Sequence, residues 1–364
     1  MEMTMRWFGS NADKIKLSEI AQVPGVKGVV GMIMDIPAGE IWPKERIKAL
    51  KEEIEAAGLT LKVIESVNIH DDIKIGLPTR DKYIENYKET IRNLAEFGIE
   101  VICYNFMPVF DWLKSDLDYR LADNSQTMAF VARDIPANPQ EIIDRVQAAD
   151  GGFSLPGWEP ERLSEVRGLF EAYKNVDEHK LRENFAYFLK AIIPTCEEVG
   201  IKMAVHPDDP PYPMFGLPRV VKNREDLDWI CNVVDSPSNA ITLCTGSIAE
   251  DPANNVYEIM AEFVKRDRIP FAHVRNIKFL PSGKKDFYEA PHMSEYGSLD
   301  MYKIMKAMYD NGFDGYIRPE HGRMIWGETG RPGYGLYDRA LGASYLNGLW
   351  DCLLYTSPSP RDCS

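Results

Sequence analysis

The stretch GYIRPEH, residues 315–321, has the composition of a short buried strand that ends in Glu320 and His321. Seven similar runs rich in Val, Ile, Phe and Tyr precede it, at residues 5–9, 27–34, 61–67, 100–106, 202–207, 240–246 and 270–277. Several of these runs are apolar throughout, which is typical of parallel strands that are covered on both faces. The chain is therefore predicted to contain eight parallel strands.

Amphipathic segments separate the strands and end at a glycine before the next strand begins, at residues 43–59, 81–99, 179–201 and 298–315. This alternation predicts an α/β fold, a (β/α)8 TIM barrel that forms one catalytic domain over residues 1–354. An open doubly wound sheet is the competing architecture, and it is disfavoured because no glycine-rich phosphate loop follows the first strand.

Two segments depart from the regular pattern. Residues 107–178 form a long insertion after the fourth strand, which we expect to make a cap over one end of the barrel. Residues 355–364 are rich in Ser and Pro and resemble translated linker sequence from a cloning adaptor, with a natural flexible tail as the alternative. Neither reading gives this tail a chemical role.

Composition excludes several classes of partner. The net charge of −14 disfavours a nucleic-acid backbone, and no apolar run approaches the roughly 18 residues that a membrane span needs. The six cysteines are scattered without a CxxC pair, which indicates reduced thiols in the cytoplasm. We expect a small sugar acid as substrate and a second copy of the chain as partner in a homo-oligomer, a dimer.

The carboxyl ends of barrel strands share one mouth. The last four predicted strands bring to it His206, Cys244, His273 and the pair Glu320 and His321. Each residue alone has a structural explanation, such as a hydrogen-bonded histidine or a small buried cysteine. Two imidazoles, a thiolate and a carboxylate at corresponding positions are the donors that a divalent transition metal uses, so the sequence predicts a metal site.

Further polar side chains lie close to the same strand ends. Arginine can grip a carboxylate with two parallel hydrogen bonds, which suits a sugar-acid ligand, although solvated surface arginines are the alternative. The predicted substrate contacts are Arg275, Asn276, His70, Arg331 and Arg323.

Seven longer segments follow one another in order along residues 1–350: MRWFG, SVNIHDDIKIG, ICYNFMPVFDW, MAVHPDDPP, LCTGS, HVRNIK and HGRMIWGETGRPGYGLYDRALG. Together they resemble the mannonate dehydratase family of hexuronate degradation. The resemblance implies a metal-dependent hydro-lyase on a (β/α)8 barrel. Such an enzyme uses Mn²⁺ or Fe²⁺ to convert D-mannonate into 2-keto-3-deoxy-D-gluconate and water in glucuronate catabolism.

The resemblance also implies roles for individual residues. His206, Cys244 and His273 would bind the metal, and His321 and Tyr334 would form the acid–base pair. The family's fourth ligand is an aspartate, whereas this chain has Glu320. The extra methylene moves the carboxylate outward by about 1.5 Å, one C–C bond length.

Dehydration of an aldonic acid removes the C2 proton and expels the C3 hydroxyl, and a divalent cation stabilises the enediolate charge. His321 suits protonation of the leaving hydroxyl, whereas Tyr334 needs a lowered pKa to act as base, and the two roles can be reversed. The alternatives are a metal-dependent sugar isomerase or epimerase, a barrel phosphodiesterase or nuclease, and a binding protein without chemistry.

Overall fold

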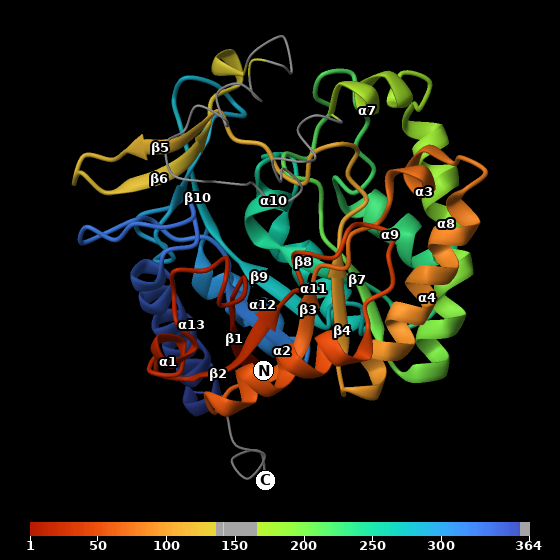
Figure 1. Cartoon of the computed structure of the whole chain (residues 1–364). Coiled ribbons are helices and arrows are strands. Elements are labelled where there is room, and N and C mark those ends of the chain that lie inside the picture. Colours follow the sequence, from red (N-terminus) through yellow and green to blue (C-terminus); the bar gives the residue numbers. More distant parts are fainter. Residues whose placement is uncertain (136–140, 142–165, 357–364) are drawn as a thin grey trace, which may run out of the picture.

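A closed barrel of eight parallel strands forms the centre of the computed structural model, which describes residues 1–135, 141 and 166–356 (Figure 1). Around the barrel the order is β1-β12-β9-β8-β7-β4-β3-β2, so consecutive barrel strands are neighbours. Their bounds are β1 (Glu2–Arg6), β2 (Val26–Gly31), β3 (Thr60–Glu65), β4 (Val101–Tyr104), β7 (Lys202–Val205), β8 (Asn239–Cys244), β9 (Phe271–Val274) and β12 (Tyr316–Pro319). The predicted TIM barrel is confirmed.

The first strand begins earlier than the predicted residues 5–9. Met3 pairs with both β2 and β12, so the strand starts at Glu2. It ends at Arg6 because the chain soon turns away at Gly9, whose φ is +95°. The other seven strands lie within or one residue outside their predicted ranges.

The inside of the barrel is filled by small and branched side chains, which explains why the strands are apolar on both faces. One buried cluster consists of strand residues alone: Val30, Val63, Val101, Cys103, Ala204, Ala240 and Phe271. A barrel interior packed in this way is a solid floor and not a pore. Polar side chains at the strand ends therefore rest on an apolar layer.

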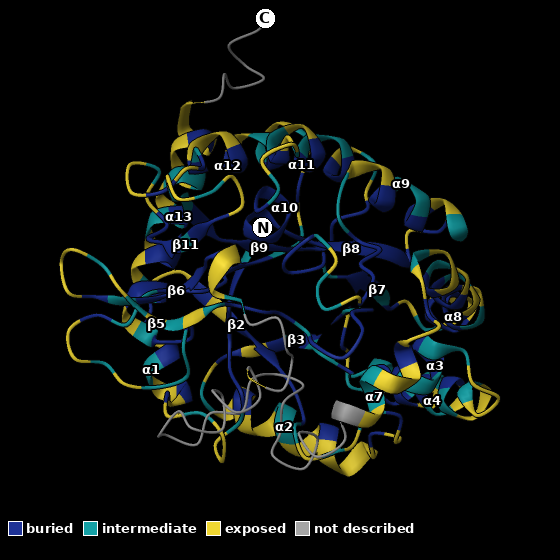
Figure 2. Cartoon of the chain, turned by 90° about the horizontal axis from the view of Figure 1, so that it is seen from above, coloured by how far each residue is buried: buried dark blue, intermediate teal, exposed yellow. Residues whose placement is uncertain are grey.

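Helices surround the barrel with buried residues facing the strands and exposed residues facing outward (Figure 2). The longer helices are α2 (Lys44–Ala56), α4 (Arg80–Glu96), α7 (Val166–Tyr173), α8 (Glu178–Val199), α9 (Arg224–Val233), α11 (Val256–Lys265), α12 (Met301–Asp310) and α13 (Leu336–Thr356). Short turns of helix are α1 (Leu17–Ile20), α3 (Asp71–Ile75), η1 (Ala132–Asp134) and α10 (Thr245–Ala249). In the described residues, no helix is long and apolar enough to cross a membrane.

The four predicted helix segments with glycine exits are confirmed as α2, α4, α8 and α12. Gly200 illustrates the reason, because it has a φ of +77° and its N–H donates to the carbonyl of Cys196. Only glycine adopts this left-handed conformation without a steric cost. The chain can therefore leave α8 and enter β7 two residues later.

A second, antiparallel sheet lies beside the barrel (Figure 1). Its order is β10-β11-β6-β5, with bounds β5 (Asp116–Arg120), β6 (Gln126–Phe130), β10 (Asn276–Phe279) and β11 (Phe287–Ala290). These short strands were not predicted, because they lack a long apolar run. The hairpin β5–β6 lies in the predicted insertion 107–178 and pairs with the hairpin that follows β9.

The domain extent 1–354 and the cap stay predictions. Within the insertion, residues 136–140 and 142–165 lie outside the described residues. At the other end, α13 continues to Thr356, two residues past the predicted boundary. The remainder of the predicted tail, residues 357–364, lies outside the described residues.

Candidate metal centre and active site

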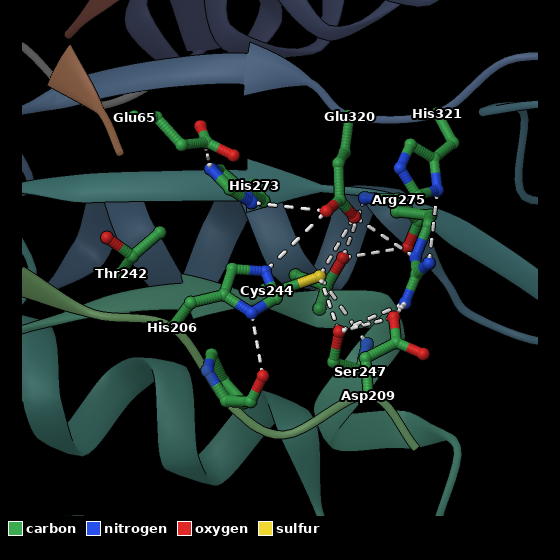
Figure 3. Close-up of polar contacts among 12 residues, drawn as sticks. Glu65, His206, Asp209, Thr242, Cys244, Ser247, His273, Arg275, Glu320 and His321 are labelled. Atoms are coloured by element: carbon green, nitrogen blue, oxygen red, sulfur yellow. Dashed lines mark hydrogen bonds and ion pairs between the residues drawn. The ribbon is translucent and has the colours of Figure 1, made fainter. Parts of the chain in front are cut away.

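Four side chains meet at the carboxyl ends of the barrel strands. His206 follows β7, Cys244 ends β8, His273 lies in β9, and Glu320 follows β12. One possible ligand atom from each lies within 4.8 Å of the others. Glu320 is central, because its Oε2 is 3.0 Å from Cys244 Sγ and its Oε1 is 3.2 Å from His273 Nδ1 (Figure 3). The structure thus brings together all four predicted ligands, while metal ligation itself stays a prediction.

The strand register places these groups at the same height. Cys244 and His273 are register partners in the parallel pair β8–β9. The Glu320 backbone N–H donates to Val274 of the neighbouring strand, and the His206 N–H donates to Tyr104. Since main-chain bonds fix each donor, the site is built into the barrel and does not depend on a loop.

The charges in the cluster favour a cation. Burial and Glu320 raise the pKa of Cys244, but Arg275 and the two histidines lower it more, to about 6. Burial likewise raises the pKa of Glu320, yet Arg275 and His321 bring it well below its usual range. The site therefore offers a thiolate and a carboxylate beside two imidazoles, which fits a divalent transition metal.

Glu65, at the end of β3, supports the cluster from the opposite side and was not predicted. Its Oε2 lies 3.2 Å from His273 Nε2, and its Oε1 accepts a hydrogen bond of 2.9 Å from Arg318. The Glu65 carboxylate attracts a proton on Nε2 at this ion-pair distance, while the hydrogen bond of the ring in this structure joins Nδ1 to Glu320. Glu65 is therefore placed to orient the His273 ring through its charge.

Glu65 also belongs to a second group of donors, with Cys103 and His273, whose ligand atoms lie within 4.8 Å of one another. Arg318 contributes a guanidinium to this group, because it is hydrogen-bonded to Glu65. An arginine also contacts the group around Glu320, so charge alone does not separate the two groups. The group around Glu320 offers four donors instead of three and is therefore the better metal site.

His321 and Tyr334, the predicted acid–base pair, lie next to the metal cluster. His321 Nε2 is 3.1 Å from Tyr334 Oη, and both side chains are buried. On the other side of the ring, Nδ1 is 2.9 Å from each carboxylate oxygen of Glu289, a residue of β11 that was not predicted. A carboxylate on one ring nitrogen and a hydroxyl on the other resemble the orienting arrangement of a catalytic histidine.

The pKa of Tyr334 is raised and not lowered. Burial is the largest cause, and the lowering effect of Arg318 does not overcome it. A role as base would need this pKa to be lowered, and the protein groups of this structure do not lower it. The phenol therefore keeps its proton at neutral pH and acts as a hydrogen-bond donor.

Arg275 lies behind the cluster, fully buried among carboxylates. Its guanidinium contacts Glu289 at 2.6 Å, Asp209 at 2.8 Å, Glu250 at 3.0 Å and Glu320 at 3.1 Å. Because its donors are used by protein groups and it does not line the cavity, Arg275 holds the site together instead of facing a ligand. Lys114 joins the same network through Asp209 and Glu250.

The other predicted substrate contacts lie away from the cavity and have protein partners. His70 caps α3 by accepting from the Asp72 N–H, and the Asn276 amide binds the backbone of the 293–299 loop. Arg323 pairs with Asp338 and Asp123, and Arg331 packs on the ring of Phe8 at 4.3 Å. In the described part of the chain, none of these four side chains lines the cavity. Their roles in substrate binding stay predictions.

A cavity opens over the cluster and is lined from both sides of the barrel mouth. Besides His206, Glu320, His321 and Tyr334, residues from the first four strands and the following segments contribute to its wall: Arg6, Phe8, Met32, Glu65, Tyr104 and Trp112. Arg6 and Trp112 were not predicted, although the segments MRWFG and VFDW that contain them stood out in the sequence. Two members of the metal cluster, His206 and Glu320, and both members of the acid–base pair therefore face one shared space.

Comparisons with known proteins agree with this arrangement. Residues 1–357 match the family model of D-mannonate dehydratase (UxuA). The mannonate dehydratase of Lactococcus lactis subsp. lactis (strain IL1403) is 98% identical over 357 residues, which cover 98% of this chain and 100% of that protein. The mannonate dehydratase of L. lactis subsp. cremoris (strain MG1363) is 96% identical over 353 residues, 97% of this chain and 99% of that protein.

A solved structure shares the whole architecture. The crystal structure of mannonate dehydratase from Streptococcus suis serotype 2 superposes with a TM-score of 0.87 at 44% sequence identity. The match covers 99% of this chain and 97% of that chain. The likeness therefore extends over nearly the whole of both chains and is not confined to one motif.

Proposed function

This chain belongs to the D-mannonate dehydratase (UxuA) family, and we propose that it is a hydro-lyase that converts D-mannonate into 2-keto-3-deoxy-D-gluconate and water. The observation that carries the proposal is the convergence of His206, Cys244, His273 and Glu320 within 4.8 Å, directly beside His321. A cation site and a proton-transfer pair in one cavity are what this dehydration requires. A role in hexuronate breakdown follows from the family.

The difficulty of the reaction lies at C2, because removal of its proton places negative charge next to a carboxylate. A divalent cation held by the four donors, which we propose to be Mn²⁺ or Fe²⁺, would supply Lewis-acid stabilisation of that charge. A set that mixes thiolate, imidazole and carboxylate suits a transition-metal ion better than Mg²⁺ or Ca²⁺, which prefer oxygen ligands alone. The choice of Mn²⁺ or Fe²⁺ among the transition metals rests on the family resemblance.

His321 is the better base of the acid–base pair. Glu289 accepts the Nδ1 proton of the neutral ring, so Nε2 carries the lone pair and faces Tyr334 and the cavity. The same carboxylate stabilises the imidazolium that forms when Nε2 takes the C2 proton. Tyr334, whose pKa is raised by burial, then donates its proton to the departing C3 hydroxyl. These roles reverse those favoured from the sequence.

Proton exchange at C2 distinguishes the two assignments. In ²H₂O, an enzyme without the acid but with the base can still exchange the C2 proton of mannonate before any water is lost. Tyr334→Phe is expected to retain measurable exchange while dehydration falls, and His321→Asn is expected to lose both. The opposite pattern would return the basic role to Tyr334.

The function itself is tested by incubating the purified protein with D-mannonate and Mn²⁺ and detecting the thiobarbiturate-reactive keto-deoxy acid. Fructuronate and xylose serve as comparison substrates. A dehydratase forms the keto-deoxy product from mannonate alone. Interconversion of fructuronate or xylose without that product would instead identify a sugar isomerase or epimerase.

The proposal also covers the location and the assembly of the enzyme. The family's metabolic role and the free thiols of the five described cysteines support a cytoplasmic enzyme. The homodimer expected from the sequence stays a prediction, and light scattering of the purified protein measures it directly.

A further inference from the structure

Arg6 differs from the other charged groups around the cavity. It ends β1, is 4% exposed and forms part of the cavity wall. One Nη nitrogen donates to the carbonyls of Trp7 at 3.1 Å and Val30 at 3.2 Å, and the other lies 2.7 Å from the sulfur of Met32. The guanidinium also packs on the Phe8 ring, 4.3 Å from its centroid. All these partners are uncharged.

Two other arginines near the site have carboxylate partners, which makes the contrast informative. Arg275 contacts Glu289 at 2.6 Å, and Arg318 contacts Glu65 at 2.9 Å. Across residues 1–135, 141 and 166–356, no carboxylate oxygen lies within the 4.0 Å ion-pair limit of the Arg6 guanidinium. The nearby carboxylate of Glu65 is already held by Arg318 and faces His273.

Burying a guanidinium without an anion is unfavourable, because its loss of hydration is compensated only in part by neutral partners. Arginine does not escape this cost by losing its proton at ordinary pH. A cation kept in such a position at the wall of a ligand cavity is a binding group for an anion that arrives with the ligand.

The backbone fixes Arg6 relative to the reacting groups. Arg339 donates to the carbonyl of Arg6 at 3.1 Å and to that of Tyr334 at 2.8 Å. The Phe8 ring, which contacts the Arg6 guanidinium, also meets the Tyr334 ring edge-to-face at 4.8 Å. An anion bound by Arg6 is therefore held at a set position with respect to the proton donor.

We propose that Arg6 binds the carboxylate of the sugar acid and makes the enzyme specific for anionic substrates. The proposal rests on the proposed function, in which the carboxylate is attached to C2, the carbon that loses its proton. It replaces Arg275, whose donors are occupied by protein carboxylates, and Arg331, which packs on Phe8 outside the cavity wall. Arg6 thereby sets the position of C2 relative to His321 and Tyr334.

The test compares matched charged and neutral ligands on the metal-loaded protein. D-gluconate differs from mannonate in configuration at C2, and its amide has nearly the same shape without the charge. Calorimetry of the parent is expected to show at least tenfold tighter binding of gluconate than of gluconamide. Arg6→Gln is expected to remove this preference and to raise the KM for mannonate about 10- to 100-fold, the effect of one lost charge-assisted contact.

Two further variants separate binding from structure. Arg6→Lys keeps the charge and is expected to restore part of the preference for gluconate, whereas Arg224→Gln, which removes an exposed surface arginine, is expected to leave it unchanged.

Equal loss of gluconate and gluconamide binding in Arg6→Gln would show a purely structural role. Equal affinity of the parent for both ligands would overturn the proposal even if the variants failed to fold. If the parent binds gluconate selectively but does not dehydrate mannonate, the proposed function fails and Arg6 remains an anion site.

Discussion

The two halves of the barrel mouth differ in the groups that end their strands. In the half formed by β7, β8, β9 and β12, the strand ends carry the four proposed metal donors, which are packed against a buried network of charges. In the half formed by β1 to β4, they carry groups that line the cavity, among them Arg6, Glu65 and Tyr104. One half is thus suited to hold an ion, and the other is suited to receive the substrate.

A buried network of charges holds the donor half together. Lys114 and Arg275 together contact the carboxylates of Asp209, Glu250 and Glu289, all of them buried. Removing one member of such a network typically costs about 3–5 kcal/mol, because the remaining charge is left unpaired. The cavity half has fewer such ion pairs, and its charged contact with the donor half passes through Glu65, which contacts both His273 and Arg318.

The largest effect is expected from removing a donor. His273→Ala deletes a proposed ligand that β9 holds beside Cys244 and Glu320, so we expect loss of bound metal and of all measurable dehydration. Metal content after gel filtration, measured by mass spectrometry, checks this result. His179→Ala is the control, because that side chain is 82% exposed on α8. Full metal content in His273→Ala would place the metal elsewhere.

The next largest effect is expected from a variant that loses proton transfer but keeps its metal. His321→Ala removes the base but none of the four donors, so the metal content is expected to equal that of the parent. Turnover of mannonate is expected to fall about 10²- to 10⁴-fold, the usual contribution of one acid–base group. Steady-state kinetics and metal analysis of the same sample measure both quantities. A variant that turned over at the parent rate would exclude His321 from proton transfer.

Weakening the contact between the two halves is expected to have a smaller effect than removing a proposed metal donor or the base. Glu65→Gln replaces the carboxylate that faces His273 Nε2 by an amide, which no longer orients the ring through its charge. The metal affinity is expected to fall about 10- to 100-fold, as for other outer carboxylates of metal-bound histidines. Competition with a chelating dye gives this affinity without reference to activity.

Glu100→Gln is the matched control for Glu65→Gln, because Glu100 pairs with Lys62 at the exposed opposite end of the barrel. It is expected to bind metal as the parent does. If Glu65→Gln also bound metal with the parent's affinity, the orientation of His273 would be set by its strand alone. The two halves of the mouth would then act independently.

The sequence predicted the donor half better than the cavity half, and the reason is geometric. Strand ends can be located from apolar runs, and a parallel barrel brings those ends together, so His206, Cys244, His273 and Glu320 could be found. Glu289 reaches His321 from a hairpin whose pairing has no periodic signal. Such contacts between distant segments are visible only in the folded chain.

The position of a residue near a strand end did not predict the direction in which its side chain points. Arg275 and Asn276 are neighbours in sequence, yet the first joins the charge network and the second binds the 293–299 loop, because successive residues in extended chain point to opposite sides. The charged residues inside apolar runs were the overlooked signal. Arg6, Glu65 and Arg318 all belong to this class, and all lie at the site.

The smallest effect concerns Glu320, the proposed donor that contacts both Cys244 and His273. At this position the family resemblance implies an aspartate. Glu320→Asp keeps the charge but withdraws the carboxylate toward β12 by about 1.5 Å, one C–C bond length. Because the flanking donors are fixed by strand register, we expect metal to remain bound and turnover to rise by less than about tenfold as the carboxylate regains the family geometry. Glu320→Gln, with the same length but no charge, is expected to lose metal affinity. Metal titration and mannonate kinetics on both variants separate the effect of side-chain length from that of side-chain charge. A fall in turnover for Glu320→Asp would mean that this barrel is adapted to the longer side chain.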